Sequence, residues 1–356
     1  MTATESMNAL VLHAVGDARF EQIKTPAPGR GEVRVRIGFC GVCGSDIPRT
    51  FVKGTYNFPT VCGHEFAGTI ESVGEGVTDW QVGDRVAVFP LLWCGKCGAC
   101  EQGKYVMCYD YDYLGSRSDG AFADYVVAPV ANLMPVPEGV SLEEASMAEP
   151  AAVALHAVKR GTPEGGLLGK SVALFGAGPI GLMVAQWCKA MGASDVFIFD
   201  IREESLELAR SMGFDQTFDS KQHNAVEKIN ELTGDQGANV CIDGAGVPIT
   251  LLQALESVRR SGRVVVLGNP SGDVTMPAAL ISQLMRREVD IVGTWNSEYS
   301  ACGNDDDWRT TLAAMADGTL NLEPLITHRV GLSEGFDALK MMRDNSEFFA
   351  KVLLHP

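Results

Sequence analysis

Four cysteines crowd into one short segment, with the spacing Cys94-x2-Cys97-x2-Cys100-x7-Cys108. Four thiolates can close a tetrahedral zinc shell at about 2.3 Å per sulfur, which leaves no coordination position open for a substrate. Four unrelated free thiols or an iron–sulfur cluster are the alternatives, because spacing alone does not exclude iron. Tight cysteine spacing in a long chain favours metal over a disulfide framework, so the motif predicts a structural zinc site.

A second motif is a glycine pattern of the G-x-G-x-x-G type, Gly176-Ala177-Gly178-Pro179-Ile180-Gly181. It follows an apolar run at Val172–Phe175 and opens a segment with helical periodicity, which is the context that a dinucleotide-binding turn requires. The glycines allow a tight turn, a close approach of pyrophosphate to the backbone, and close packing of the helix on the strand. The free N–H groups at the start of the helix would face the phosphates.

An acidic residue follows this motif at the expected interval. Asp200 comes nineteen residues after Gly181 and ends the next apolar run, Val196–Phe199. Its carboxylate can bond the ribose hydroxyls of NAD and would repel the additional phosphate of NADP. Arg202 could instead contact that phosphate, so NADP remains an alternative. A helix-capping aspartate in a fold without a dinucleotide is the remaining interpretation.

A scattered set of residues could hold a second metal ion. Cys43 lies in Cys43-Gly44-Ser45-Asp46, His64 and Glu65 are adjacent, and Glu149 precedes a proline. A cysteine, a histidine and a carboxylate with one labile position would suit a catalytic zinc ion. Spacing alone leaves the alternative that Cys43 is a small buried hydrophobic residue and His64 a core histidine. Cys40-x2-Cys43 could also be a redox pair, but no thioredoxin-like pattern surrounds it.

Three cations lie near these motif segments: Arg49, Lys53 and Arg117. Together they could form a pocket for a phosphorylated substrate. Ordinary surface charge or a salt bridge to an acidic residue is the alternative for each of them. Trp295, Asn296 and Tyr56 could line the same cleft or serve as core and wall residues.

The elements that must position these residues differ along the chain. As far as about residue 155, short alternating runs such as Glu32–Ile37 and Arg85–Phe89 predict a β-rich or barrel-like region. From about 170 to 295, apolar runs alternate with helical patterns, which predicts a parallel sheet covered on both faces. The predicted strands are Val172–Phe175, Val196–Phe199, Gln216–Phe218, Val240–Ile242, Val264–Leu267 and Val289–Val292. The predicted helices are Ile180–Met191, Glu203–Met212, Ala225–Leu232 and Ile249–Val258.

The region after residue 297 is too short to be expected to form a domain of its own. It contains two helical segments, Trp308–Ala316 and Glu334–Met342, and a final β-type run, Lys351–Leu354. We therefore expect this region to return and complete the first domain.

The composition excludes some classes of function. The chain has 356 residues and a formal net charge of −16, which argues against nucleic-acid binding and against docking on an anionic membrane. No apolar run approaches the roughly 20 residues that cross a bilayer, and the first residues lack a signal-peptide pattern. We expect a cytoplasmic protein with a small-molecule substrate.

The motifs occur in an order that resembles the zinc-containing medium-chain dehydrogenases. The resemblance covers essentially the whole chain. It is strongest for the polyol branch, which includes sorbitol dehydrogenases and polyol-phosphate dehydrogenases. The segments that carry this closer similarity are Cys43–Arg49, Leu114–Gly120 and Leu322–Ile326.

The resemblance implies specific roles for residues of this chain. Cys43, His64 and Glu65 would hold a catalytic zinc ion, and Glu149 would be a fourth ligand or a partner of the zinc-bound water. Ser45 would relay the proton of the substrate hydroxyl. Many alcohol dehydrogenases place a histidine three residues after this serine, but the chain has Pro48 there, so the proton must leave by another route.

The resemblance also implies an architecture. A GroES-like β-rich catalytic domain would comprise residues 1–156 and 297–356, and a doubly wound Rossmann domain that binds NAD would comprise residues 157–296. The active site would be the cleft between them. The implied activity is oxidation of a secondary hydroxyl of a polyol or polyol phosphate by a homodimer or homotetramer. The alternatives are a secondary-alcohol or threonine-type dehydrogenase and a non-catalytic NAD-binding relative.

Overall fold

Two compact units make up the chain in the computed structural model, which describes residues 5–301, 303 and 305–356. One unit combines the residues up to Pro150 with Glu298–Pro356, and the other comprises Ala151–Ser297. The domain boundaries at 156/157 and 296/297 stay a prediction. Among the described residues, no helix is long and apolar enough to cross a membrane.

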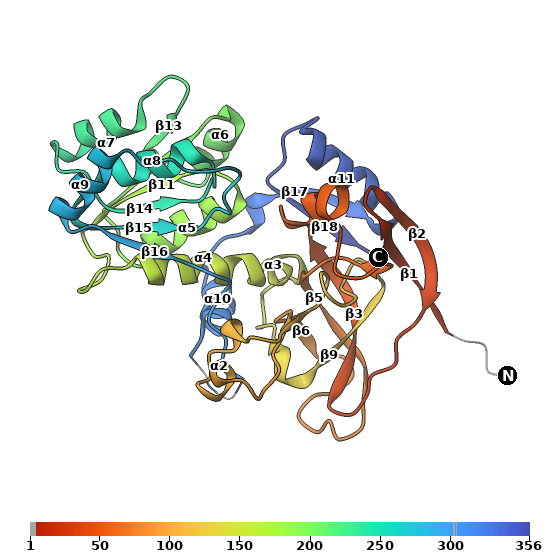
Figure 1. Ribbon diagram of the computed structural model, residues 1–356. Helices are drawn as coiled ribbons and strands as arrows, with labels where there is room; N and C mark the ends of the chain where they lie inside the picture. Colours follow the sequence, from red (N-terminus) through yellow and green to blue (C-terminus); the bar gives the residue numbers. More distant parts are fainter. Residues whose placement is uncertain (1–4, 302, 304) are drawn as a thin grey trace. The chain divides into compact units, whose positions relative to one another are not determined.

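The second unit contains a six-stranded parallel sheet (Figure 1). The spatial order of its strands is β13, β12, β11, β14, β15 and β16. Their bounds are Thr217–Asp219, Asp195–Asp200, Ser171–Phe175, Ala238–Asp243, Val258–Val266 and Asp290–Gly293. Because the order reverses between β11 and β14, this sheet has the 3-2-1-4-5-6 topology of a Rossmann fold, and the prediction of a doubly wound α/β unit is confirmed.

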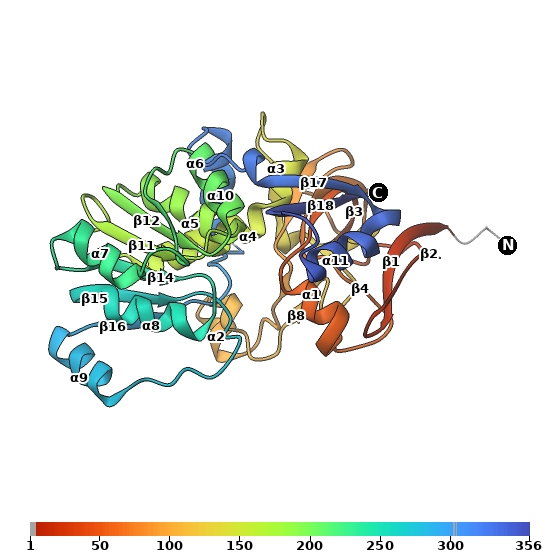
Figure 2. The ribbon, with the colours of Figure 1, turned by 90° about the horizontal axis from the view of Figure 1, so that it is seen from above.

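Helices cover this sheet on both faces. They are α5 (Pro179–Ala190), α6 (Glu203–Ser211), α7 (Ala225–Thr233), α8 (Pro248–Ser257) and α9 (Ala278–Arg287). Figure 2 shows α7, α8 and α9 along one side, where Phe175 and Phe197 pack against buried residues of these helices. Residues of the opposite strand face, such as Leu174 and Ile198, are also buried. On α5, the Trp187 ring N–H donates to the carbonyl oxygen of Ala151 at 3.0 Å, at the start of this unit.

The first unit is built around a mixed sheet of seven strands. Six of them follow the order β10, β6, β5, β3, β18 and β17, and β9 also pairs with β3. Their bounds are Leu133–Pro135, Arg85–Val88, Glu65–Val73, Glu32–Gly41, Lys351–His355 and Ile326–Gly331, with Tyr125–Pro129 for β9. Since β18 pairs with β3, the region after residue 297 returns to this sheet.

Smaller elements complete the first unit. A second sheet has the order β2, β1 and β4, and a short pair joins β7 to β8. These strands are Asp17–Lys24, Ser6–Ala14, Thr60–Val61, Leu91–Leu92 and Asp112–Tyr113. The helices are α1 (Asp46–Pro48), α2 (Gly98–Glu101), α3 (Leu142–Ser146), α10 (Asp307–Ala316) and α11 (Gly335–Asp344), and α4 (Ala148–Gly161) begins at the end of this unit. One apolar core joins the strands, with Phe66, Ile70 and Phe122 almost fully buried.

Candidate functional site

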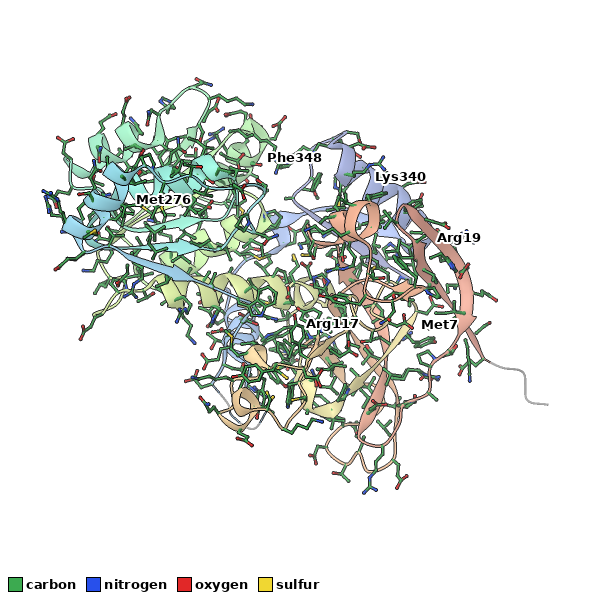
Figure 3. The ribbon with its side chains drawn as sticks, in the orientation of Figure 1. Met7, Arg19, Arg117, Met276, Lys340 and Phe348 are labelled. Carbon is green, nitrogen blue, oxygen red and sulfur yellow. The ribbon has the colours of Figure 1, made fainter. Side chains whose placement is uncertain are left out.

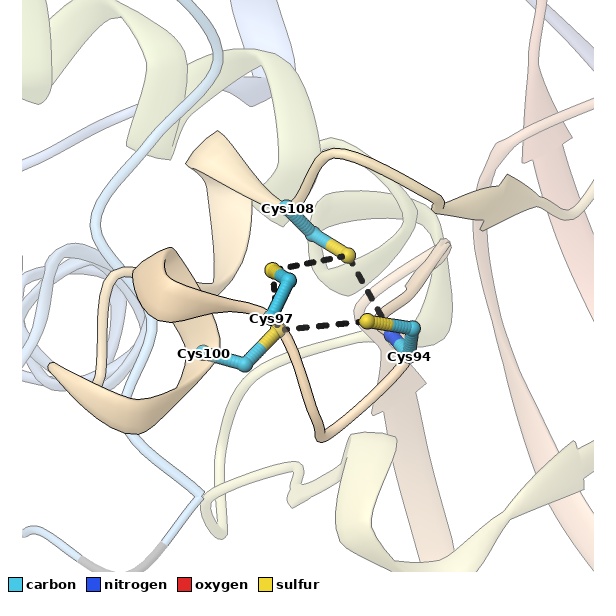
Figure 4. Close-up of side chains that lie close together, drawn as sticks. All are labelled: Cys94, Cys97, Cys100 and Cys108. Atoms are coloured by element: carbon cyan, nitrogen blue, oxygen red, sulfur yellow. Dashed lines mark hydrogen bonds between the residues drawn. The ribbon is translucent and has the colours of Figure 1, made fainter.

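The four clustered cysteines converge on one point of a small lobe (Figure 4). The sulfur atoms of Cys97 and Cys100 are 3.5 Å apart, those of Cys97 and Cys108 3.9 Å, and those of Cys94 and Cys100 4.0 Å. Zinc–sulfur bonds of about 2.3 Å in a tetrahedron require sulfur separations of about 3.8 Å. The lobe therefore has the dimensions of a four-thiolate zinc shell.

The lobe also favours the thiolate form of one of its cysteines. Backbone hydrogen bonds from Tyr109 and Cys100 lower the pKa of the Cys97 thiol to about 6. The Cys94 backbone N–H donates to the Cys108 sulfur at 3.2 Å. Because the thiolate is the form that binds a metal, these amide donors prepare the lobe for an ion.

A second group of possible metal ligands forms where β3 meets β5. The ligand atoms of Cys43, His64 and Glu65 all lie within 4.8 Å of one another. The register of the β3–β5 pairing explains why Cys43 lies near Glu65. Gly41 is opposite Glu65, and Cys43 follows Gly41 by two residues. A Cβ atom at Gly41 would lie 2.3 Å from Oε2 of Glu65, so a larger residue here would displace this carboxylate. Burial, with Glu65 and Asp46 nearby, raises the pKa of the Cys43 thiol.

A lysine from β18 joins this group. Lys351 Nζ lies 2.6 Å from Glu65 Oε2, and the two side chains are 4% and 1% exposed. Burial opposes the charge of Lys351, but the attraction of Glu65 and Cys43 outweighs it and raises the pKa of the lysine. One oxygen of Glu65 is thus engaged, and its other oxygen is available to a metal ion.

Asp46, at the start of α1, contacts both Cys43 and His64 of this ligand group. Its Oδ2 accepts the Cys43 backbone N–H at 3.0 Å, and its carboxylate forms an ion pair with Arg49. Asp46 Oδ1 also lies 3.7 Å from His64 Nδ1, a buried atom that has no hydrogen-bond partner among the described residues. Metal-binding histidines commonly direct their second nitrogen at a carboxylate, so this arrangement fits a His64 that binds an ion through its other nitrogen.

Glu149 lies close to this group without joining it. Among the described residues, the ligand set within 4.8 Å contains only Cys43, His64 and Glu65. The Tyr113 hydroxyl donates to Glu149 Oε1 at 3.1 Å. Burial, strengthened by the charge of Glu65, raises the pKa of Glu149 to about 7. Its role as a fourth ligand stays a prediction.

Ser45 lies beside the ligand group and is exposed. Its backbone N–H points at the Cys43 sulfur at 3.5 Å, and its hydroxyl oxygen is 3.5 Å from Arg49 Nη2. Pro48 ends α1 three residues later. Because the side chain of Ser45 is exposed, its hydroxyl can still donate a hydrogen bond to a small molecule.

The glycine motif forms the turn between β11 and α5. Gly176 has a φ of +104°, and a Cβ atom at Gly181 would lie 2.0 Å from the carbonyl oxygen of Gly176. By contrast, a Cβ atom at Gly178 would meet nothing within 4 Å, so this backbone is open to a ligand. Pro179 occupies the first turn of α5, and Ile180 follows it. These features fit a pyrophosphate at the helix N-terminus.

Asp200 faces this turn. Its Oδ2 accepts the Ala177 backbone N–H at 2.6 Å, and its Oδ1 accepts the Arg202 backbone N–H at 2.8 Å. A carboxylate has about four lone-pair sites, so Asp200 can hold the glycine turn and still accept bonds from ribose hydroxyls.

The three predicted phosphate-binding cations have different environments. Arg49 is engaged by Asp46, as the salt-bridge alternative anticipated, and Lys53 is exposed. Arg117 lies over the rings of Tyr56 and Tyr111. The shared phosphate pocket of these three cations therefore stays a prediction. Trp295 is exposed and Asn296 has a φ of +54°.

The chain belongs to the zinc-binding dehydrogenase family. The alcohol dehydrogenase GroES-like domain matches residues 29–138, and the zinc-binding dehydrogenase domain matches residues 179–317. The predicted resemblance, the GroES-like plus Rossmann fold class and the assignment as an enzyme are confirmed.

Within this family the chain is similar to galactitol 1-phosphate 5-dehydrogenase of Escherichia coli strain K12. The two are 37% identical, with 91% of this chain and 92% of the relative covered. The crystal structure of galactitol-1-phosphate dehydrogenase from Escherichia coli matches with a TM-score of 0.90 and 36% identity, covering 98% of this chain and 100% of the other. A sorbitol dehydrogenase of Bacillus subtilis is 32% identical with 100% and 99% covered, and an L-threonine 3-dehydrogenase of Pyrococcus horikoshii is 31% identical with 96% of each covered.

The expected cofactors, zinc and NAD, are confirmed for this family. Its matching model describes a zinc-binding dehydrogenase. An Escherichia coli CFT073 alcohol dehydrogenase complexed with NADH matches with a TM-score of 0.88 and 30% identity, covering 99% of each chain. A zinc-binding dehydrogenase from Sinorhizobium meliloti 1021, bound to NADP, matches with a TM-score of 0.89 and 28% identity, covering 99% of this chain and 100% of the other.

Three residues of the site were not assigned a role from the sequence: Asp46, Tyr113 and Lys351. Asp46 was visible in the Cys43–Arg49 segment, three residues after the cysteine whose amide it accepts. The indication for Lys351 was weaker, since it is a charged residue at the first position of an otherwise apolar strand. In the structure this lysine is buried. Tyr113 had none, because its contact with Glu149 joins residues that are 36 positions apart.

Proposed function

We propose that the protein oxidises a secondary hydroxyl of a polyol or polyol phosphate to a ketone and transfers the hydride to NAD, with galactitol 1-phosphate as the leading candidate substrate. The observation that supports this most is the group formed by Cys43, His64 and Glu65 within one domain. Three protein ligands leave a fourth position for a substrate, as catalytic zinc sites do.

In this proposal Cys43, His64 and Glu65 hold one ion, and Cys94, Cys97, Cys100 and Cys108 hold a second. When bound, the first ion supplies a Lewis acid that polarises the substrate hydroxyl, and NAD supplies the hydride acceptor. Asp46 orients His64, and Lys351 fixes one oxygen of Glu65 so that the other can face the ion. The second ion has a structural role.

Ser45 accepts the proton of the substrate hydroxyl in this mechanism. It is exposed beside Cys43, and its hydroxyl can both donate and accept a hydrogen bond. Pro48 offers no side-chain donor or acceptor, so the proton continues through water or a cofactor hydroxyl. Glu149 has a raised pKa and interacts electrostatically with His64 and Glu65, so in this mechanism it would receive or return a proton during turnover.

The dinucleotide is held by the turn from Gly176 to Gly181. The free N–H groups at the start of α5 bind its pyrophosphate, and the open backbone at Gly178 allows a close approach. Asp200 favours NAD over NADP because its charge would repel a ribose phosphate. Arg202 is the residue that would have to compensate if NADP were used.

We also propose that the protein is cytoplasmic and acts as a homodimer or homotetramer. A threonine-type dehydrogenase is the second candidate function, because the similar L-threonine 3-dehydrogenase shares 31% identity over nearly the whole chain. A non-catalytic NAD-binding relative is disfavoured by the complete ligand group with Ser45 beside it.

A substrate panel tests the proposal. NADH formation is followed with galactitol 1-phosphate, galactitol, sorbitol, threonine and butanediol, before and after removal of metal by a chelator. We expect polyol-dependent activity that the chelator abolishes and zinc restores. Activity confined to threonine would favour the second candidate, and NADH binding without turnover of any substrate would contradict an enzymatic role.

A further inference from the structure

Arg117, which is labelled in Figure 3, lies against two tyrosine rings. Its guanidinium carbon lies 4.1 Å from the ring centroid of Tyr111 and 4.4 Å from that of Tyr56. Its Nη1 donates to the Tyr111 carbonyl oxygen at 3.0 Å. Its Nη2 also donates to the Tyr56 hydroxyl oxygen at 3.5 Å. The two rings and the two hydrogen bonds restrain the guanidinium, and its remaining N–H groups can still donate. Arg117 is therefore a preoriented donor.

The segment that carries Arg117 is fixed to the backbone beside His64. Cβ atoms at Gly115 and Gly120 would lie 2.3 and 2.2 Å from the carbonyl oxygen of Gly63, so both positions require glycine. The Ala121 N–H donates to the same oxygen at 2.9 Å. Gly63 directly precedes His64, so the backbone on both sides of Arg117 is held next to the candidate metal group.

Aromatic contacts connect the same two places. The ring of His64 lies 5.8 Å from that of Tyr113, and the ring of Tyr113 lies 6.4 Å from that of Tyr111, which Arg117 covers. All these residues belong to one compact unit. Two ring contacts, through Tyr113 and Tyr111, thus connect His64 of the metal group with Arg117.

The charge of Arg117 is not neutralised by a carboxylate. Within the part of the chain that the structure describes, Arg117 forms no ion pair, whereas Arg49 is paired with Asp46. The nearest acidic residues in the sequence serve the backbone: Asp112 accepts the Tyr113 N–H at 2.7 Å, and Asp119 accepts the Val61 N–H at 2.9 Å. An unpaired and preoriented cation in a chain of net charge −16 is suited to an anionic ligand.

We propose that Arg117, held by Tyr56 and Tyr111, binds a phosphate monoester at the end of the substrate that does not react, and so selects phosphorylated over free polyols. This inference rests on the proposed polyol oxidation. An arginine fork matches the spacing of phosphate oxygens and forms charge-assisted hydrogen bonds with them, whereas a polyol hydroxyl offers only a neutral acceptor. Arg49 and Lys53 are not required for this binding.

The test compares Arg117→Gln, Arg117→Lys and Tyr56→Leu with the wild type, using galactitol 1-phosphate and galactitol. Arg36→Gln is the matched control, because it removes the same charge from an exposed position on β3 of the same unit. We expect Arg117→Gln to lower kcat/KM for galactitol 1-phosphate by about 30- to 100-fold, equivalent to about 2–2.7 kcal/mol, mainly through KM, because charge-assisted hydrogen bonds to the phosphate are lost. Activity with galactitol should change less than about twofold.

The other variants separate charge from orientation. Arg117→Lys keeps the charge without the planar fork, and Tyr56→Leu removes one stacking ring, so each should lose part of the preference for phosphate. Arg36→Gln should match the wild type with both substrates. Equal losses with galactitol and its phosphate, or an equal loss in Arg36→Gln, would overturn the inference.

Binding is measured separately by titration calorimetry of the zinc-loaded, NADH-bound protein with galactitol 1-phosphate. Wild-type binding that Arg117→Gln weakens supports the inference even if no turnover is seen, in which case only the proposed function fails. Turnover of polyols without any preference for the phosphorylated form, or the absence of phosphate-dependent binding, overturns the inference and leaves polyol oxidation standing.

Discussion

The two candidate metal groups of the first unit are built in opposite ways. The cysteine lobe takes all four ligands from fifteen consecutive residues, and its sulfur atoms already stand at tetrahedral separations. The other group takes Cys43 from the residues just after β3, His64 from just before β5 and Glu65 from the first position of β5. It relies on Asp46 and Lys351 to hold those ligands.

This difference separates a closed site from an open one. In the lobe the ligands supply the whole coordination shell, so the site needs few supporting residues. Three ligands leave part of an ion uncovered, and buried charged partners are then needed to fix the geometry. The comparison predicts that damage to the open site affects chemistry, whereas damage to the closed site affects stability.

The largest effect is expected from Cys43→Ser. Loss of the thiolate should lower kcat/KM by about 10⁴-fold, equivalent to about 5 kcal/mol, because the substrate loses the Lewis acid. Metal analysis should find about one zinc ion per chain instead of about two, with the melting temperature nearly unchanged. Retention of both ions and of activity would show that the open site is not where catalysis occurs.

Cys97→Ser should have the opposite profile. The variant should lose one zinc ion and about 4 kcal/mol of stability, because metal binding to a structural site contributes directly to folding. Hydrogen exchange should increase within residues 94–108, and kcat should fall much less than in Cys43→Ser. An unchanged melting temperature would contradict the structural role of the lobe.

Lys351→Met tests whether a buried counter-charge stabilises the open site formed by Cys43, His64 and Glu65. It leaves Glu65 buried without its counter-charge, which should destabilise the metal-free protein by about 3 kcal/mol. Zinc should restore more stability to this variant than to the wild type, because the ion can neutralise Glu65. Urea unfolding with and without zinc measures both effects, and the Glu65→Gln/Lys351→Met double variant is the control that should recover stability.

The smallest effect is expected at an ion pair of the same sheet whose residues belong to neither metal group. Arg34 Nε lies 2.6 Å from Glu71 Oε2, and this hydrogen bond lowers the pKa of Glu71. Its contribution is therefore present above the unfolded pKa of about 4.3 and is lost as pH falls through the lower folded pKa. Glu71→Gln should cost about 1 kcal/mol at pH 7, since the pair is partly exposed. Equal costs at pH 7 and pH 3 would contradict this assignment.

The Rossmann unit could be predicted in detail because its signals are local. All six strands and the helices α5 to α8 were anticipated, since buried parallel strands form short apolar runs between helical patterns. The strand β15 begins at Val258, six residues before the predicted start, because Arg259, Arg260 and Ser261 interrupt its apolar run. The helices α4 and α9 were not predicted. In the first unit, β17 was not predicted either, because its residues Thr327, His328 and Arg329 do not form an apolar run.

The candidate sites were also predictable only where their residues are close together in the sequence. The cysteine lobe and the glycine turn could be predicted because their residues are adjacent in the sequence. The residue types at Cys43, His64 and Glu65 suggested a metal site, but the alternative of core residues stayed open until the resemblance was considered, because β3–β5 pairing brings these ligands together. The pairing of Lys351 with Glu65 could not be predicted, since it depends on which strand β18 joins.

The separation of 286 residues between Glu65 and Lys351 has a consequence for biosynthesis. At about 5–20 residues per second, a ribosome takes roughly 15–60 seconds to add the lysine after the glutamate has been incorporated. During that interval the nascent chain carries a carboxylate whose eventual neighbour does not yet exist. Zinc that arrives early would meet Glu65 unrestrained, so the order of metal loading and chain completion could decide which cation reaches this carboxylate first.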